Sequence, residues 1–223
     1  MHHFEKDLDG LKQTLLTMAS HAEAAVKRAI NALVERNDDL ARQVETDDRI
    51  LDQFEIDLDE MSISLLSKAP LATDLRLITV AMKISRDLER VGDEATTIAR
   101  RSVELSQEPQ LKPYVDIPRM AAMALEMLGD ALDSFVNRNT DKARAVIPRD
   151  KEVDALNKQL HRELSSYMVE RPTTITRCLN LMVISKCLER IADHATNIAE
   201  EVVYLYEARD IRHTGKGQPV APP

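Results

Sequence analysis

Glycine and aromatic residues are scarce in this chain of 223 residues, which has 5 glycines, 3% aromatic residues and no tryptophan. Tight turns depend strongly on glycine, so a sheet of many strands joined by short hairpins is disfavoured. Leucine, alanine, glutamate, lysine and arginine, which favour helices, are abundant instead. No run of 18 apolar residues is present, so the sequence offers no candidate membrane-spanning helix. The composition predicts a helical globular protein.

Positive charge is also in deficit, because 30 lysine and arginine residues face 38 aspartate and glutamate residues and leave a formal net charge of −8. A general nucleic-acid-binding protein needs a basic face that displaces counterions from phosphates. A protein that binds a membrane surface unaided needs a basic face that attracts anionic lipids. Neither class fits, so we expect no nucleic-acid partner and contact with a membrane only through other proteins.

Cysteine is represented only by Cys178 and Cys187. On one helix these two residues lie roughly 13 Å apart along the axis, which is too far for a disulfide. Two thiols that cannot pair within the chain indicate a reducing compartment. The first residues lack the apolar core of a signal peptide, so we expect a cytoplasmic protein.

The chain contains an internal repeat. An offset of 102 residues aligns residues 32–44 with residues 134–146. An offset of 100 residues aligns residues 84–105 with residues 184–205, where 12 of 22 positions are identical. The offset changes in a loop just after Pro70, which is two residues shorter in the second copy. This similarity predicts a tandem duplication of one structural unit.

Each copy has the pattern of three helices. In the first copy, apolar residues recur at helical spacing, with Asn37 as an N-cap and Pro70 as the end of the second helix. We therefore expect an all-α protein, a tandem duplication of an antiparallel three-helix bundle with six long helices. The expected domains are residues 1–108 and 109–213, with a linker at residues 106–118 and a flexible tail at residues 214–223. The expected helices are residues 4–35, 38–69, 74–106, 118–138, 140–170 and 174–208.

Pairs of acidic residues four positions apart, which share a helix face, occur at four matched places in the repeat. In the second copy, the two pairs are equally distant from a hairpin centred near residues 171–172. Antiparallel helices then bring four carboxylates to one height, and the first copy does the same. Four carboxylates offer up to about eight oxygens to a hard or borderline cation, and without one they repel each other or take up protons. The eight candidate metal ligands are Asp48, Asp52, Glu89, Asp93, Asp150, Asp154, Glu189 and Asp193.

The alternative interpretation is an ordinary solvated helix face. Glu89 and Asp93 lie roughly 140–180° from the centre of the apolar stripe of their helix, and neighbouring arginines could pair with them. A metal ion on such a face would be exposed and exchangeable. His194, beside Asp193, and His21 are weaker candidates for a nitrogen ligand, and the second copy has methionine at the place of His21.

Motifs for catalysis are missing. The sequence has no GxxxxGK[ST] or GxGxxG loop for phosphates, no GxSxG nucleophile elbow and no CxxC pair. No nucleophile is paired with a base, and we expect no enzyme.

The segments LERVGD at residues 88–93 and LERIAD at residues 188–193 resemble the repeated motif of the PhoU family of phosphate-signalling regulators. The resemblance extends over about residues 4–215. One departure is Ala192, where the motif usually has glycine, and this change removes no ligand. Further segments that resemble the family are residues 16–18, Glu23, Pro70, residues 73–77, residues 195–198 and residues 210–213.

The resemblance implies a cytoplasmic, all-helical and often dimeric protein that binds metal ions (Fe, Zn, Mn or Mg) through E(D)xxxD motifs. It also implies negative regulation of phosphate transport and of the phosphate-starvation response. The implied partners are the ATPase subunit of the phosphate ABC transporter and a sensor histidine kinase. We therefore expect a homodimeric phosphate-homeostasis regulator that acts as an adaptor in signal transduction. The motifs that the resemblance assigns are Glu89/Asp93 and Glu189/Asp193, with Asp48/Asp52 and Asp150/Asp154 by the same pattern.

Two other classes share part of this pattern. A di-iron carboxylate protein needs a Glu-x-x-His motif on two core-facing helices, and no glutamate here is followed three residues later by histidine. A metal-free helical scaffold or co-chaperone-like module would satisfy the same apolar periodicity.

Overall fold

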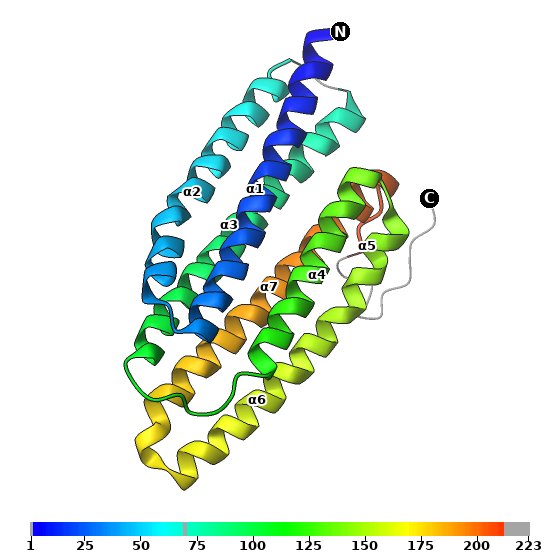
Figure 1. Cartoon of the computed structure of the whole chain (residues 1–223). Coiled ribbons are helices and arrows are strands. Elements are labelled where there is room, and N and C mark those ends of the chain that lie inside the picture. Colours follow the sequence, from blue (N-terminus) through cyan, green and yellow to red (C-terminus); the bar gives the residue numbers. More distant parts are fainter. Residues whose placement is uncertain (1, 69–70, 212–223) are drawn as a thin grey trace.

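The computed structural model describes residues 2–68 and 71–211, and in these residues it contains helices and no strand. The predicted all-α fold of two tandem helical bundles is confirmed (Figure 1). Pro70 and the predicted tail at residues 214–223 lie outside the described residues. The elements are α1 (His2–Glu35), α2 (Asp38–Leu66), α3 (Ala72–Ser106), α4 (Asp116–Asn137), α5 (Thr140–Val146), η1 (Ile147–Arg149), α6 (Asp150–Glu170), η2 (Pro172–Thr174) and α7 (Ile175–Glu207).

The second bundle differs from the first in one helix. The single helix expected at residues 140–170 is divided by the 3₁₀ turn η1 into α5 and α6. Pro148 lies in this turn, at the place where the first copy has Thr46 within an unbroken α2. Proline has no N–H to donate and its ring crowds the preceding turn, so the helix tightens there.

Both bundles begin their second helix in the same way. Asn37 and Asn139 are N-caps in extended conformation, and their side-chain oxygens accept hydrogen bonds from Leu40 N at 3.0 Å and Lys142 N at 2.9 Å. The residues before these caps, Arg36 and Arg138, both have φ of 54° and end the preceding helix in left-handed conformation. The predicted N-cap at Asn37 is therefore confirmed, and the turn between the first two helices is the same in both copies.

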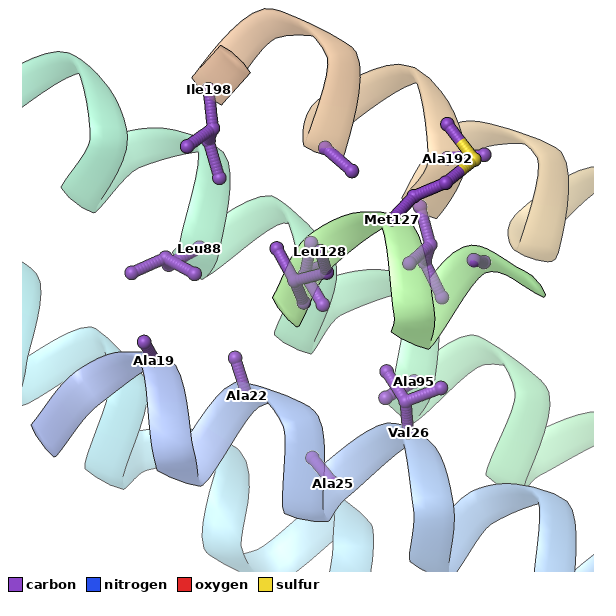
Figure 2. Packing of buried hydrophobic residues seen from close by; sticks show 14 of the residues in the cluster. Ala19, Ala22, Ala25, Val26, Leu88, Ala95, Met127, Leu128, Ala192 and Ile198 are labelled. Atoms are coloured by element: carbon purple, nitrogen blue, oxygen red, sulfur yellow. The ribbon is translucent and has the colours of Figure 1, made fainter. Parts of the chain in front are cut away.

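The two bundles share one hydrophobic core. The buried apolar residues of α1, α3, α4 and α7 form a continuous cluster, and α3 packs lengthwise on α7. Figure 2 shows Ala19 and Ala22 of α1 directed towards Leu88 of α3 and Leu128 of α4, so small side chains let the helices approach closely. Among the residues 2–68 and 71–211, no helix is long and apolar enough to cross a membrane.

Polar contacts fix the relative position of α3 and α7. Lys83 donates to both carboxylate oxygens of Glu201 at 3.1 and 3.0 Å, and Arg190 pairs with Glu94 at 3.2 Å. Residue numbers rise along α3 as those of their partners fall along α7, so the two helices are antiparallel. The equivalent helices of the two copies therefore run in opposite directions.

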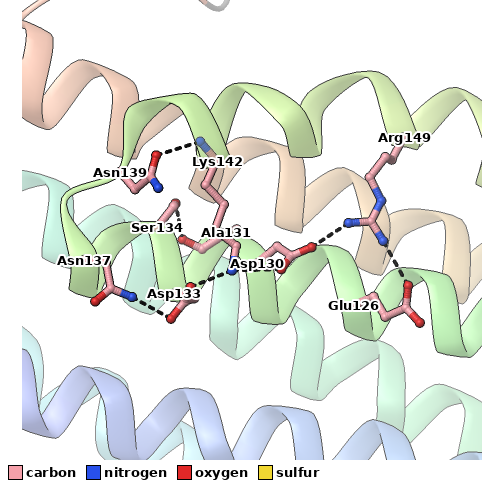
Figure 3. A network of polar contacts seen from close by, with 9 residues as sticks. All are labelled: Glu126, Asp130, Ala131, Asp133, Ser134, Asn137, Asn139, Lys142 and Arg149. Carbon is pink, nitrogen blue, oxygen red and sulfur yellow. Dashed lines mark hydrogen bonds and ion pairs between the residues drawn. The ribbon is translucent and has the colours of Figure 1, made fainter.

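A charge pair between the first and second helix recurs with its sign reversed. In the first copy, Arg28 of α1 bonds to Asp47 of α2 at 2.6 Å. At the equivalent positions of the second copy, Asp130 of α4 accepts from Arg149 of η1 at 2.6 Å. Figure 3 shows that Arg149 also reaches Glu126 on α4, at 3.1 Å. The same geometric link thus joins the two helices of each copy with opposite polarity.

Candidate metal centres

The acidic pairs of the first copy come together between α2 and α3. Burial, and then the charges of Asp52 and Asp93, raise the pKa of Asp48. Burial, and then the charges of Asp93 and Glu55, raise the pKa of Glu89 to about 7. Since carboxylates on both helices act on one another in this way, the antiparallel packing has brought the pairs to one height, as the spacing predicted.

Glu55 belongs to this group and was not found from the sequence. It lies three residues after Asp52 and seven after Asp48, so the three share one face of α2. That spacing could have identified Glu55 as a further candidate ligand. The second copy has Asn157 at the equivalent position, so a comparison of the two copies does not reveal Glu55. We call Asp48, Asp52, Glu55, Glu89 and Asp93 the first carboxylate cluster.

The second copy brings its own pairs together between α6 and α7. Burial, and then the charges of Asp154 and Glu189, raise the pKa of Asp150. Partial loss of water, and then the charge of Asp150, raise the pKa of Asp193. We call Asp150, Asp154, Glu189 and Asp193 the second carboxylate cluster.

The alternative interpretation, a solvated helix face, describes only some of these acids. Asp52 and Asp193 are exposed, whereas Glu189 is 8% exposed and the side chain of Glu89 is 18% exposed. The helical-wheel angle measures distance from the apolar stripe on one helix and takes no account of the neighbouring helix. Here α2 covers that side of α3, and α6 covers the equivalent side of α7. Each cluster therefore lies in a seam between two helices.

Basic side chains accompany each cluster. In the first, Arg90 lies 3.5 Å from an oxygen of Glu89 and 3.5 Å from one of Asp93. In the second, Lys186 forms an ion pair with Glu189, and Lys158 lies 3.7 Å from Asp154. These are the pairings that a solvated face would also show, and they neutralise only part of the negative charge.

The donor set of both clusters fits a hard cation. Carboxylates prefer such ions, and a cation placed among acids whose pKa values are raised removes the repulsion that raises them. A carboxylate oxygen of Asp150 is buried and has no hydrogen-bond partner among the described residues. In the arrangement of residues 2–68 and 71–211, however, no three carboxylate, imidazole or thiolate groups converge on one point. Binding of an ion therefore requires these side chains to rotate towards one another.

The weaker histidine candidates lie elsewhere. The Nδ1 atom of His194 lies 2.8 Å from an oxygen of Asp87 on α3, so its ring faces the interface between the bundles. The ring of His21 packs against Phe54, with centroids 5.4 Å apart. Both histidines thus have structural contacts of their own in the described part of the chain.

Neither cysteine has the surroundings of a nucleophile. Cys178 and Cys187 are buried free thiols on α7. Burial, and then the neighbouring carboxylate of Glu94, raise the pKa of the Cys187 thiol, which keeps it protonated. A protonated buried thiol is a poor nucleophile and a poor metal ligand.

Two tandem three-helix bundles, each with a carboxylate cluster in the seam between its last two helices, define a class of helical repeat proteins. The model of the PhoU domain matches this chain twice, at residues 15–102 and at residues 117–202. The chain belongs to the PhoU family. The expected domain boundaries at residues 108 and 213 stay predictions.

Relatives and solved structures agree over nearly the whole length. The phosphate-specific transport system accessory protein PhoU homolog of Pseudomonas aeruginosa is 40% identical over 214 residues, which are 95% of this chain and 88% of the relative. The Escherichia coli protein PhoU is 32% identical over 213 residues, with 95% and 88% covered. The crystal structure of PhoU from Pseudomonas aeruginosa superimposes with a TM-score of 0.89 at 39% identity, and covers 92% of this chain and 100% of its own. The phosphate transport system regulatory protein PhoU of Streptococcus pneumoniae gives 0.88 at 27% identity, with 93% and 99% covered.

Proposed function

We propose that this protein is a non-catalytic accessory regulator of phosphate transport, which lowers phosphate uptake and represses the phosphate-starvation response when phosphate is plentiful. The observation that carries the proposal is the full-length match, with both PhoU domains present and 40% identity to a phosphate-specific transport system accessory protein. The relative's name gives it a role beside a transporter, and the crystal structure of PhoU from Pseudomonas aeruginosa matches 92% of this chain.

The protein acts, in this proposal, as a cytoplasmic adaptor. Its partners are the ATPase subunit of the phosphate ABC transporter and a sensor histidine kinase, and it reaches the membrane through them. Its acidic composition and the lack of a spanning helix in the described residues are consistent with that route. A homodimer is the proposed assembly.

The two carboxylate clusters are the proposed metal sites, for divalent or trivalent ions such as Fe, Zn, Mn or Mg. The ligands would be Asp48, Asp52, Glu89 and Asp93 in the first copy, and Asp150, Asp154, Glu189 and Asp193 in the second. The raised pKa values of Asp48, Glu89, Asp150 and Asp193 support this assignment, since these groups gain most from a neighbouring cation. A bound ion would draw α2 to α3 and α6 to α7, and so fix the surface that the partners recognise.

The test is capture of the transporter ATPase by the purified protein. The variant Glu89→Gln/Asp93→Asn/Glu189→Gln/Asp193→Asn keeps the size of each side chain and removes four charges. We expect it to fold with an unchanged circular dichroism spectrum and to lose most of its Mn²⁺ binding and most of its capture of the ATPase.

A matched control removes acids that lie outside both clusters. Asp59→Asn/Glu170→Gln changes exposed residues on α2 and α6 and should bind Mn²⁺ and the ATPase as the wild-type protein does. Unchanged capture by the cluster variant would refute a role of metal in docking. A wild-type protein that binds no metal and still captures the ATPase would favour the metal-free scaffold instead.

A further inference from the structure

The two carboxylate clusters are unequal in charge. The first holds five acids. Arg90 lies 3.5 Å from Glu89 and from Asp93, and the charge of Arg100 also acts on Asp48. The second holds four acids, with Asn157 in place of Glu55, and two lysines lie against it. Formal charges are therefore about −3 for the first group with Arg90 and Arg100, and about −1 for the second with its two lysines and Arg190, whose charge also acts on Glu189.

The lysines of the second cluster occupy positions that differ between the copies. Lys186 forms an ion pair with the Oε2 atom of Glu189, whose side chain is buried. Lys158 pairs with Asp154 at 3.7 Å, whereas the first copy has an exposed Ile56 at the equivalent position. An ammonium group of the protein itself thus lies where a bound cation would have to be placed.

The interface between the bundles explains why the two copies use different basic residues. Arg190, the equivalent of Arg90, pairs with Glu94 of α3 at 3.2 Å. The equivalent of Glu94 in the second copy is His194, which is bonded to Asp87 at 2.8 Å. With no acid at position 194 to attract it, Arg90 stays with the first cluster.

We infer that the two clusters bind cations unequally: the first is loaded first, and the second is held closed to metal by Lys186 and Lys158, which act as tethered counter-ions. This inference rests on the proposed metal sites and adds the order in which they fill. A cation entering the second cluster must displace an ammonium group from the buried Glu189, whereas one entering the first meets a fifth carboxylate, Glu55. The protein would then respond to metal in two steps, because the first cluster binds its cation at a lower metal concentration than the second.

The experiment separates the clusters by removing one at a time. Mn²⁺ is titrated into full-length protein, and the free ion is measured by its electron paramagnetic resonance signal. Glu89→Gln/Asp93→Asn leaves the second cluster, and Glu189→Gln/Asp193→Asn leaves the first. Because carboxylates attract the cation and ammonium groups repel it over a few ångströms, we expect binding about tenfold or more tighter in the protein that keeps the first cluster.

Further variants test the residues held responsible. On the background that keeps the second cluster, Lys158→Met/Lys186→Met should strengthen Mn²⁺ binding several-fold. Lys12→Met removes a similar short-range ion pair on α1, Lys12 to Asp9 at 3.3 Å, and should leave binding unchanged. On the background that keeps the first cluster, Glu55→Gln should weaken binding several-fold.

The Mn²⁺ titrations distinguish failure of this inference from failure of the proposed metal sites. Equal affinities, or tighter binding by the second cluster, would overturn the inference and leave the proposed metal sites standing. No binding of Mn²⁺ by the wild-type protein would overturn the proposed metal sites as well. If the two clusters bind Mn²⁺ with unequal affinity, but neither Lys158→Met/Lys186→Met nor Glu55→Gln changes that affinity, then these residues do not cause the difference.

Discussion

Gly92, in the first copy of the motif, lies so close to α2 that an added Cβ atom would overlap a side chain of that helix. A Cβ atom added at Gly92 would lie 2.4 Å from Cδ1 of Leu51 and 3.3 Å from a carboxylate oxygen of Asp48. The second copy has Ala192 at the equivalent position, and it has Val153 where the first has Leu51. The second copy thus combines the larger residue at the glycine position, Ala192, with the smaller residue at the leucine position, Val153.

This relation predicts the outcome of a double-mutant cycle. Carbon atoms in contact lie about 3.5–4.0 Å apart, so Gly92→Ala forces buried Leu51 to move by about 1 Å or more. Overpacking of this kind costs about 1–3 kcal/mol, and the better helix propensity of alanine returns about 1 kcal/mol. Gly92→Ala should therefore lower the free energy of unfolding by about 1 kcal/mol. Leu51→Val alone should also cost about 1 kcal/mol, through the cavity it leaves.

The double variant tests whether positions 51 and 92 are energetically coupled. Leu51→Val/Gly92→Ala removes the overlap, so its free energy of unfolding should exceed the additive expectation by about 1 kcal/mol or more. Urea denaturation followed by circular dichroism at 222 nm measures all four proteins. Additivity to within about 0.5 kcal/mol would refute the account of this contact. Ala192→Gly is the matched control in the second copy, and it should only destabilise, since no overlap is relieved there.

Three further predictions concern features that recur in both copies or in the first cluster. Arg28→Asp places two acids together and should destabilise, and adding Asp47→Arg should recover about 1 kcal/mol in urea denaturation; no recovery would contradict the pairing. Arg138→Gly relieves a left-handed residue and should raise stability by about 1 kcal/mol, whereas Arg36→Gly should gain less because the Arg36 side chain donates to two linker carbonyls at 2.6 Å; equal gains would contradict a structural role of those bonds. The pKa of Glu89, raised from 4.5 to about 7, gives metal-free protein a stability contribution that is full below pH 4.5 and lost as pH rises through 7. Urea midpoints at pH 5 and pH 8 should therefore fall less for Glu89→Gln than for wild type, and an equal fall would contradict the raised pKa.

Local rules predicted most of the fold. Apolar periodicity gave the helices to within a few residues at most ends, and asparagine capping placed the start of α2 at Asn37. The repeat then supplied the architecture, because two copies of one pattern must fold alike. The break at Pro148 was missed because one proline in a long helical pattern does not by itself distinguish a kink from a tightened turn.

The candidate site was predicted in outline, and its burial and ion pairs were not. Spacing from the hairpin placed both acidic pairs of each copy at one height. Burial of Glu189 depends on which helix covers which face, and the pairing of Arg190 with Glu94 depends on how the bundles dock. Neither is encoded in the periodicity of a single helix. Glu55 was overlooked because comparison of the copies favours what they share.

The reversed charge pair has a consequence for a chain that carries two nearly interchangeable units. If the first helix of one unit paired with the second helix of the other, Arg28 would meet Arg149, and Asp130 would meet Asp47. Each wrong combination sets like charges at a distance where the correct one has a short ion pair, so both are disfavoured while the nascent hairpins search for partners. Duplication makes such exchanged hairpins possible. The reversed polarity of this one ion pair makes them less stable than hairpins formed within each copy.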